Sequence, residues 1–240
     1  MRFIIILALL FHSMTWADSS FENHFHHTSQ AMSALYMYEL SNANPEYLAT
    51  FKKHIYAANQ TIKKTSNNTQ SIFLNRWQEL LPYWIFKKVR YTEDLYLDEV
   101  VRYEAREYLT DLFLHLQTIH TNDNSSQQKI TDIKLYTAML LARALDILST
   151  HQGSAALSQH DKKINAKSLS KTVHANIKYL LSEPFSTSQH KNLRKVRDQF
   201  EFIDRNITGY DYKMPYFLLY KSVINMKKRL NSHPHILANR

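Results

Sequence analysis

Hydrophobic side chains recur every three or four residues along most of this chain, and short polar stretches separate the runs. The longest run lies in 92–120, where Val101, Ala105, Tyr108, Leu112 and Leu116 fall on one side of a helix. The opposite side carries charges of both signs at helical spacing. A helix of this length extends roughly 40 Å at 1.5 Å per residue, so it can bury its apolar stripe only against several helices of similar length.

Seven further stretches show the same periodicity, and few show the alternation typical of a strand. They cover residues 21–40, 45–62, 70–90, 125–148, 161–181, 188–207 and 215–230. Asn44 and Pro45 suit the N-cap and the first turn of a helix, and Ser19 and Ser125 each precede a Glu or Gln by three residues, the spacing of a capping box. Pro82 predicts a kink or an interruption in the third helix. The sequence therefore predicts an all-α fold, a bundle of about eight antiparallel helices.

A polar segment at 121–126 divides the predicted helices into two groups of four. Short similar sequences occur in the same order in both groups, such as Ala31-Met32 and Ala138-Met139. This order favours an old duplication of a four-helix unit, with repeats at 20–121 and 127–235, although helical sequences also resemble one another by chance.

The first residues have the pattern of a secretory signal peptide. Arg2 precedes a hydrophobic run at 3–11, and the small residues Thr15 and Ala17 follow it. The run is too short to cross a bilayer. We expect a signal peptide at 1–17 and a soluble helical domain at 18–240 that is periplasmic or secreted and has no transmembrane segment after cleavage. An uncleaved signal anchor is the alternative.

The chain contains no cysteine and only two glycines, which excludes several classes of function. An exported domain without cysteine depends on its core rather than on disulfides, and it cannot attach a c-type haem. The two isolated glycines exclude a P-loop, a dinucleotide-binding loop and a nucleophile elbow. The zinc motif H-E-x-x-H is also missing. We therefore predict no cofactor and no catalytic residues, and we expect non-catalytic binding of a protein partner or a small-molecule ligand in the cell envelope.

The formal net charge of +9 is unevenly distributed along the chain. Residues 18–150 contain 13 Lys and Arg against 15 Asp and Glu, whereas residues 151–240 contain 16 against 6. If the sixth and seventh predicted helices are neighbours, their basic side chains form one cationic surface that could meet lipid headgroups or polysaccharide. Nucleic acid is not expected for an exported chain, and a solvated face of a basic protein is the alternative. The residues of this surface are Lys163, Lys167, Lys171, Lys191, Arg194 and Lys195.

Three histidines, His24, His26 and His27, cluster near the expected mature N-terminus. Imidazoles are suitable ligands for zinc or copper, so these residues predict a loose metal site at the surface of a periplasmic metal-binding protein. Incidental histidines at a frayed helix end are the alternative.

The chain contains 15 tyrosines, and several fall on or near inward-facing stripes. Interior tyrosines need hydrogen-bond partners for their hydroxyls. Glu104 and Arg143 flank apolar stripes and could serve Tyr103 and Tyr136, which predicts a polar ligand pocket or an enzyme site without a recognisable motif. A plain hydrogen-bonded core is the alternative.

Overall fold

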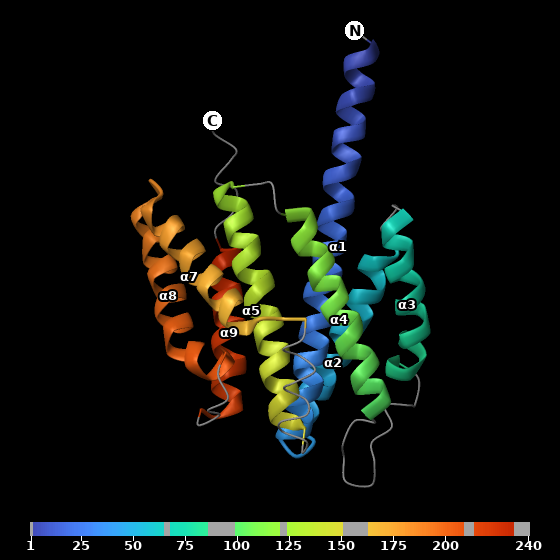
Figure 1. Ribbon diagram of the computed structural model, residues 1–240, viewed down its shortest axis with the longest axis vertical. Helices are drawn as coiled ribbons and strands as arrows, with labels where there is room; N and C mark the ends of the chain where they lie inside the picture. Colours follow the sequence, from blue (N-terminus) through green and yellow to red (C-terminus); the bar gives the residue numbers. More distant parts are fainter. Residues whose placement is uncertain are drawn as a thin grey trace. The chain divides into compact units, whose positions relative to one another are not determined.

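The computed structural model describes residues 2–64, 68–85, 99–120, 124–150, 163–208 and 214–232. This part of the chain forms eight helices and no strand (Figure 1). The helices are α1 (Arg2–Leu40), α2 (Pro45–Ile62), α3 (Asn68–Ile85), α4 (Glu99–His120), α5 (Ser126–Ser149), α7 (Ala166–Ser182), α8 (Thr187–Thr208) and α9 (Tyr216–Asn231). The predicted all-α bundle is confirmed for the described residues, and the antiparallel order of its helices stays a prediction.

Helix starts follow the predicted caps at two positions. Asn44 Oδ1 accepts a hydrogen bond from the backbone N of Glu46 at 3.0 Å, directly before α2. Ser125 Oγ accepts one from the backbone N of Gln128 at 3.1 Å, directly before α5. Each bond satisfies an amide that has no partner within its own helix. By contrast, α3 contains Pro82 and continues beyond it to Ile85, so the proline does not interrupt the helix, and the alternative of a kink stays a prediction.

Helix α1 begins much earlier than the sequence pattern indicates. It runs without a break from Arg2 to Leu40, so Ser19 lies inside the helix and is not an N-cap. The helix also passes through Ala17, where we expect signal cleavage, and that cleavage stays a prediction. Among the described residues, none of the helices combines the length and the hydrophobicity that crossing a bilayer requires.

The chain forms two compact units, Met1–Leu116 and Gln117–Arg240. In the first unit α1 packs along α2, and α3 packs against α2. In the second unit α5 contacts α7, α8 and α9, and α8 also packs against α7 and α9. The division falls inside α4, a few residues before the polar segment at which we placed the repeat boundary. Whether the repeats reflect a duplication stays a prediction.

The turn between α1 and α2 has an unusual backbone. Asn42 and Ala43 both have positive φ, 53° and 66°. The backbone N of Ala43 donates to the carbonyl O of Tyr38 at 2.9 Å, which closes the end of α1. The left-handed region is unfavourable for an alanine because its Cβ approaches the following carbonyl. The turn is therefore a point of local backbone strain.

Candidate ligand-binding cleft

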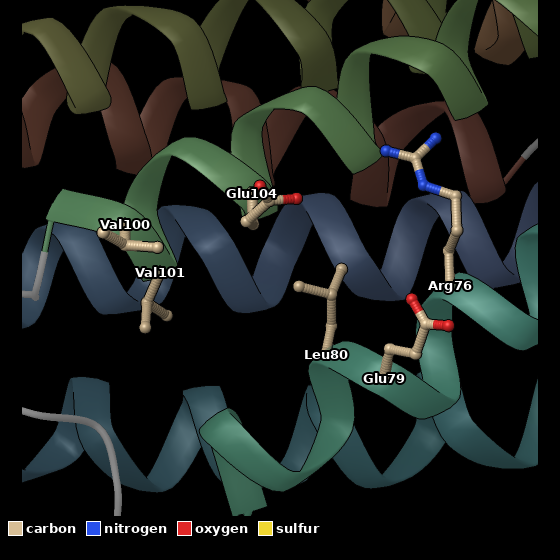
Figure 2. Close-up of a pocket in the computed structure, with 6 residues that line it drawn as sticks. All are labelled: Arg76, Glu79, Leu80, Val100, Val101 and Glu104. Carbon is tan, nitrogen blue, oxygen red and sulfur yellow. The ribbon is translucent and has the colours of Figure 1, made fainter.

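A cavity of about 510 Å³ lies in the first unit, between α3 and α4 (Figure 2). Three residues of each helix line it, and on each helix the first and the last of the three lie four positions apart, which places them on the same side. Its lining residues are Arg76, Glu79, Leu80, Val100, Val101 and Glu104.

The apolar part of the cleft is anchored in the core of the first unit. Leu80 and Val101 are only 8% and 7% exposed, and they fix the floor of the cavity. Val100 is 69% exposed although it is a large hydrophobic residue. Figure 2 shows Val100 and Val101 at one end of the cleft and Leu80 near its middle. An exposed valine beside an apolar floor offers surface that a ligand could cover.

The charged side chains of the cleft differ in their partners. Arg76 Nη1 donates to Asp111 Oδ2 at 2.9 Å, and the guanidinium carbon lies 5.6 Å from the centre of the Tyr108 ring. Glu79 and Glu104 are exposed, and within the described part of the chain neither has a hydrogen-bond or ion-pair partner. The positive charge of the cleft is therefore already paired, whereas its two carboxylates are not.

Behind the cleft, Tyr108 connects α4 to a buried histidine. Tyr108 Oη lies 2.6 Å from His24 Nε2, and His24 Nδ1 lies 2.9 Å from the carbonyl O of Ala58. A carbonyl can only accept, so Nδ1 carries the proton, and Nε2 accepts from the tyrosine hydroxyl. Burial lowers the pKa of His24 to about 3, and burial also raises the pKa of Tyr108. Both groups are therefore neutral at ordinary pH.

Trp77 completes this buried group. Its ring packs edge-on against His24, with ring centroids 4.8 Å apart, and its Nε1 donates to Asn59 Oδ1 at 3.3 Å. The interactions of His24, Tyr108 and Trp77 thus connect all four helices of the first unit.

The predicted surface position is wrong for two of the three histidines. His24 is 0% and His26 is 7% exposed, and His24 is enclosed by its contacts with α2, α3 and α4. His27 Nδ1 instead lies 3.0 Å from His54 Nδ1 on α2, with ring centroids 5.3 Å apart. The two Nδ1 atoms are at hydrogen-bond distance, so one ring donates to the other. Among the described residues, no three His, Cys, Asp or Glu side chains are grouped as a metal site would require.

The four residues of the predicted polar pocket belong to different units. Glu104 lines the cleft in the first unit, whereas its neighbour Tyr103 is 45% exposed and does not face inward as expected. Tyr136 and Arg143 belong to the second unit, where Arg143 is buried and burial raises the pKa of Tyr136. Of this set, the cleft contains Glu104 alone, and its role in binding stays a prediction.

The sequence did not single out Arg76 or Glu79. Their spacing places them on one side of α3, but the same spacing is found on any solvated helix face. What distinguishes them is the opening between α3 and α4, which depends on tertiary packing.

The cationic surface was predicted on the condition that its two helices are neighbours, and the structure meets that condition. Helices α7 and α8 are neighbours, and all six predicted residues are exposed. The exposed side of α8 also carries acidic residues, since Arg197 pairs with Asp198 at 2.8 Å and lies 3.7 Å from Glu201. The positive character of this surface is therefore diluted on α8, and its binding role stays a prediction. The six residues are Lys163, Lys167, Lys171, Lys191, Arg194 and Lys195.

Comparisons of the chain with models of known protein families, with curated proteins and with solved structures found no match. The function is therefore inferred from the chemistry of the chain's own residues.

Proposed function

We propose that this chain is a non-catalytic binding protein of the cell envelope that holds a small ligand in the cleft between α3 and α4. The observation that carries the proposal is the cleft itself. Its volume of about 510 Å³ falls within the usual range of small-molecule sites, roughly 300 to 1,000 Å³. It combines an apolar floor with a few charged groups, which is the usual composition of such sites.

The residues of the cleft favour binding over catalysis. Among the described residues, its lining contains no serine, histidine or lysine, and its two carboxylates, Glu79 and Glu104, are exposed and have no partner that would position them for proton transfer. His24 lies behind Tyr108 with both ring nitrogens engaged, so it is not available as a general base. The location in the cell envelope is supported by the signal-peptide pattern at 1–17.

The proposal is tested by filling the cleft. A fragment library is screened by ligand-observed NMR against the full chain and against Val100→Trp, which adds a large side chain at an exposed position of the lining. Ile72→Trp is the matched control, because Ile72 is 60% exposed on α3 but does not line the cleft. We expect hits that disappear with Val100→Trp and persist with Ile72→Trp. A library without hits, or hits unaffected by Val100→Trp, would contradict the proposal.

A second candidate function is contact with an anionic surface through α7 and α8. It is supported by the exposure of all the predicted basic residues on two neighbouring helices. Co-sedimentation with vesicles containing phosphatidylglycerol tests it, with Lys167 and Lys171 changed to Gln and with Lys52 and Lys53 changed to Gln as the charge-matched control on α2. We expect salt-sensitive binding that only the α7 changes weaken. If both pairs of lysine changes weaken vesicle binding equally, the net charge of the protein alone explains the binding.

A further inference from the structure

We infer that the ligand of the cleft is a small organic cation with an apolar body, such as an amine attached to an aromatic or short aliphatic group. This inference rests on the proposed function and names the chemical class that the cleft would select. Two independent features lead to it, the unbalanced charge of the lining and the arrangement of its apolar side chains.

The charge of the cleft is negative where a ligand would lie. Arg76 forms an ion pair with Asp111 at 2.9 Å, and its guanidinium lies over the ring of Tyr108. Its positive charge is therefore already balanced by groups of the protein. Glu79 and Glu104 lie on different helices and, among the described residues, neither makes an ion pair or a hydrogen bond with a group of the protein. A ligand that brings a positive charge supplies the missing partner for both carboxylates.

The apolar residues of the lining determine the chemical character of the rest of the ligand, away from its positive charge. Figure 2 shows Val100 and Val101 at one end of the cleft, Arg76 and Glu79 at the other, and Leu80 and Glu104 between them. A cationic group near the two glutamates therefore leaves the remainder of the ligand over Leu80 and the two valines. Apolar groups at that end gain from covering exposed hydrocarbon, and polar groups there lose hydration without gaining a partner.

An anionic ligand fits these contacts poorly. Among the described residues, the lining contains one cation, and an anion would have to share Arg76 with Asp111 while lying close to Glu79 and Glu104. Like charges at close range oppose binding even when water screens them. The lining thus discriminates between ligands of the same shape by the sign of their charge.

The test uses three probes that share one aromatic body: phenethylamine, phenethyl alcohol and phenylacetate. Each is titrated against the full chain by calorimetry and by ligand-observed NMR. We expect the amine to bind about ten-fold more tightly than the alcohol, and phenylacetate to bind more weakly than either. Raising the salt from about 20 mM to about 300 mM weakens binding of the amine, leaves binding of the uncharged alcohol unchanged and relieves the repulsion that opposes phenylacetate.

Variants place the amine in the cleft. Glu79→Gln and Glu104→Gln each weaken amine binding about two- to five-fold, and the double variant weakens it about ten-fold, while binding of the alcohol stays unchanged. Glu201→Gln is the control, since it removes the same charge from an exposed position on α8. Equal weakening by Glu201→Gln would assign the effect to net charge and overturn the inference.

The outcomes separate the inference from the proposed function. If phenylacetate or the alcohol binds as tightly as the amine, and Val100→Trp blocks it, the cleft binds ligands but the cationic class is wrong. If the amine binds but the glutamate variants leave its affinity unchanged, the amine binds elsewhere and the inference is again wrong. If no probe binds and the fragment screen also fails, both are wrong.

Discussion

Acid should destabilise the first unit through a single buried side chain, His24. Burial lowers its pKa from 6.5 to about 3, because the imidazole loses water and gains no anionic partner. The unfolded chain binds a proton at this position below pH 6.5, whereas the native protein does so only near pH 3. The free energy of unfolding therefore falls as the pH decreases through this window, by about 2 kcal/mol at pH 5 and about 3 kcal/mol at pH 4 for this residue alone.

The variant His24→Gln isolates this contribution. A glutamine side chain has an NH2 group that can donate to the carbonyl O of Ala58 and a carbonyl oxygen that can accept from the Tyr108 hydroxyl, but it does not titrate. Its packing is imperfect, and we expect it to be less stable than the original chain at pH 8. The diagnostic quantity is the change with pH, and between pH 7.5 and pH 5 the variant should lose about 2 kcal/mol less than the original chain.

The assay is urea-induced unfolding followed by the fluorescence of Trp77. Trp77 is 0% exposed and packs against His24, so it reports on this unit when Trp16 and Trp84 are replaced by phenylalanine. His190→Gln, on α8 in the second unit, is the control and should leave the pH dependence of the Trp77 transition unchanged. Equal losses of stability in His24→Gln and the original chain would refute the reasoning.

Three further predictions concern backbone strain, a buried ion pair and a buried amine. Ala43→Gly should raise the free energy of unfolding by up to about 1 kcal/mol, because glycine tolerates the φ of 66° without a Cβ clash, and a lower melting temperature would contradict this. Glu39→Gln should lower it by about 3 to 5 kcal/mol, because a neutral amide replaces the carboxylate that pairs with the buried guanidinium of Arg102, which is 5% exposed, and a loss below about 1 kcal/mol in urea unfolding would contradict this. Burial, together with the charge of Lys134, lowers the pKa of Lys227 to about 8, so an NMR titration of its terminal methylene should have a midpoint well below that of exposed lysines. Lys134→Met should raise that midpoint, and an unchanged midpoint would exclude the lysine as a cause.

Sequence signals that depend on neighbouring residues predicted several of the helices correctly. The periodicity of 92–120 and the caps at Asn44 and Ser125 all depend on neighbours within a few residues. The structure contains both caps and a helix over 99–120, and residues 92–98 lie outside the described part of the chain. The capping-box spacing at Ser19 is equally clear in the sequence, yet α1 continues through it. A cap is one hydrogen bond of modest free energy, and a helix that gains from continuing can override it.

The site could be predicted only in part, because its contacts join residues that are distant in sequence. His24 looked like a solvent-exposed ligand near a chain end, but its partner Tyr108 follows 84 residues later. Glu104 was singled out as a polar residue beside an apolar stripe, whereas Arg76 and Glu79 were not. Nothing local reveals which two helices leave a cavity between them, so only the tertiary structure shows that Glu79 and Glu104 line the same cleft.

One aromatic ring separates two different environments in the first unit. The outer side of Tyr108 meets the guanidinium of Arg76 at the edge of the cleft, and its hydroxyl reaches the dry interior at His24. A molecule entering the cleft alters the electric field that this ring experiences, even though the imidazole behind it never touches the newcomer. We therefore expect ligand binding in the cleft to shift the NMR signals of His24, although solvent does not reach this histidine.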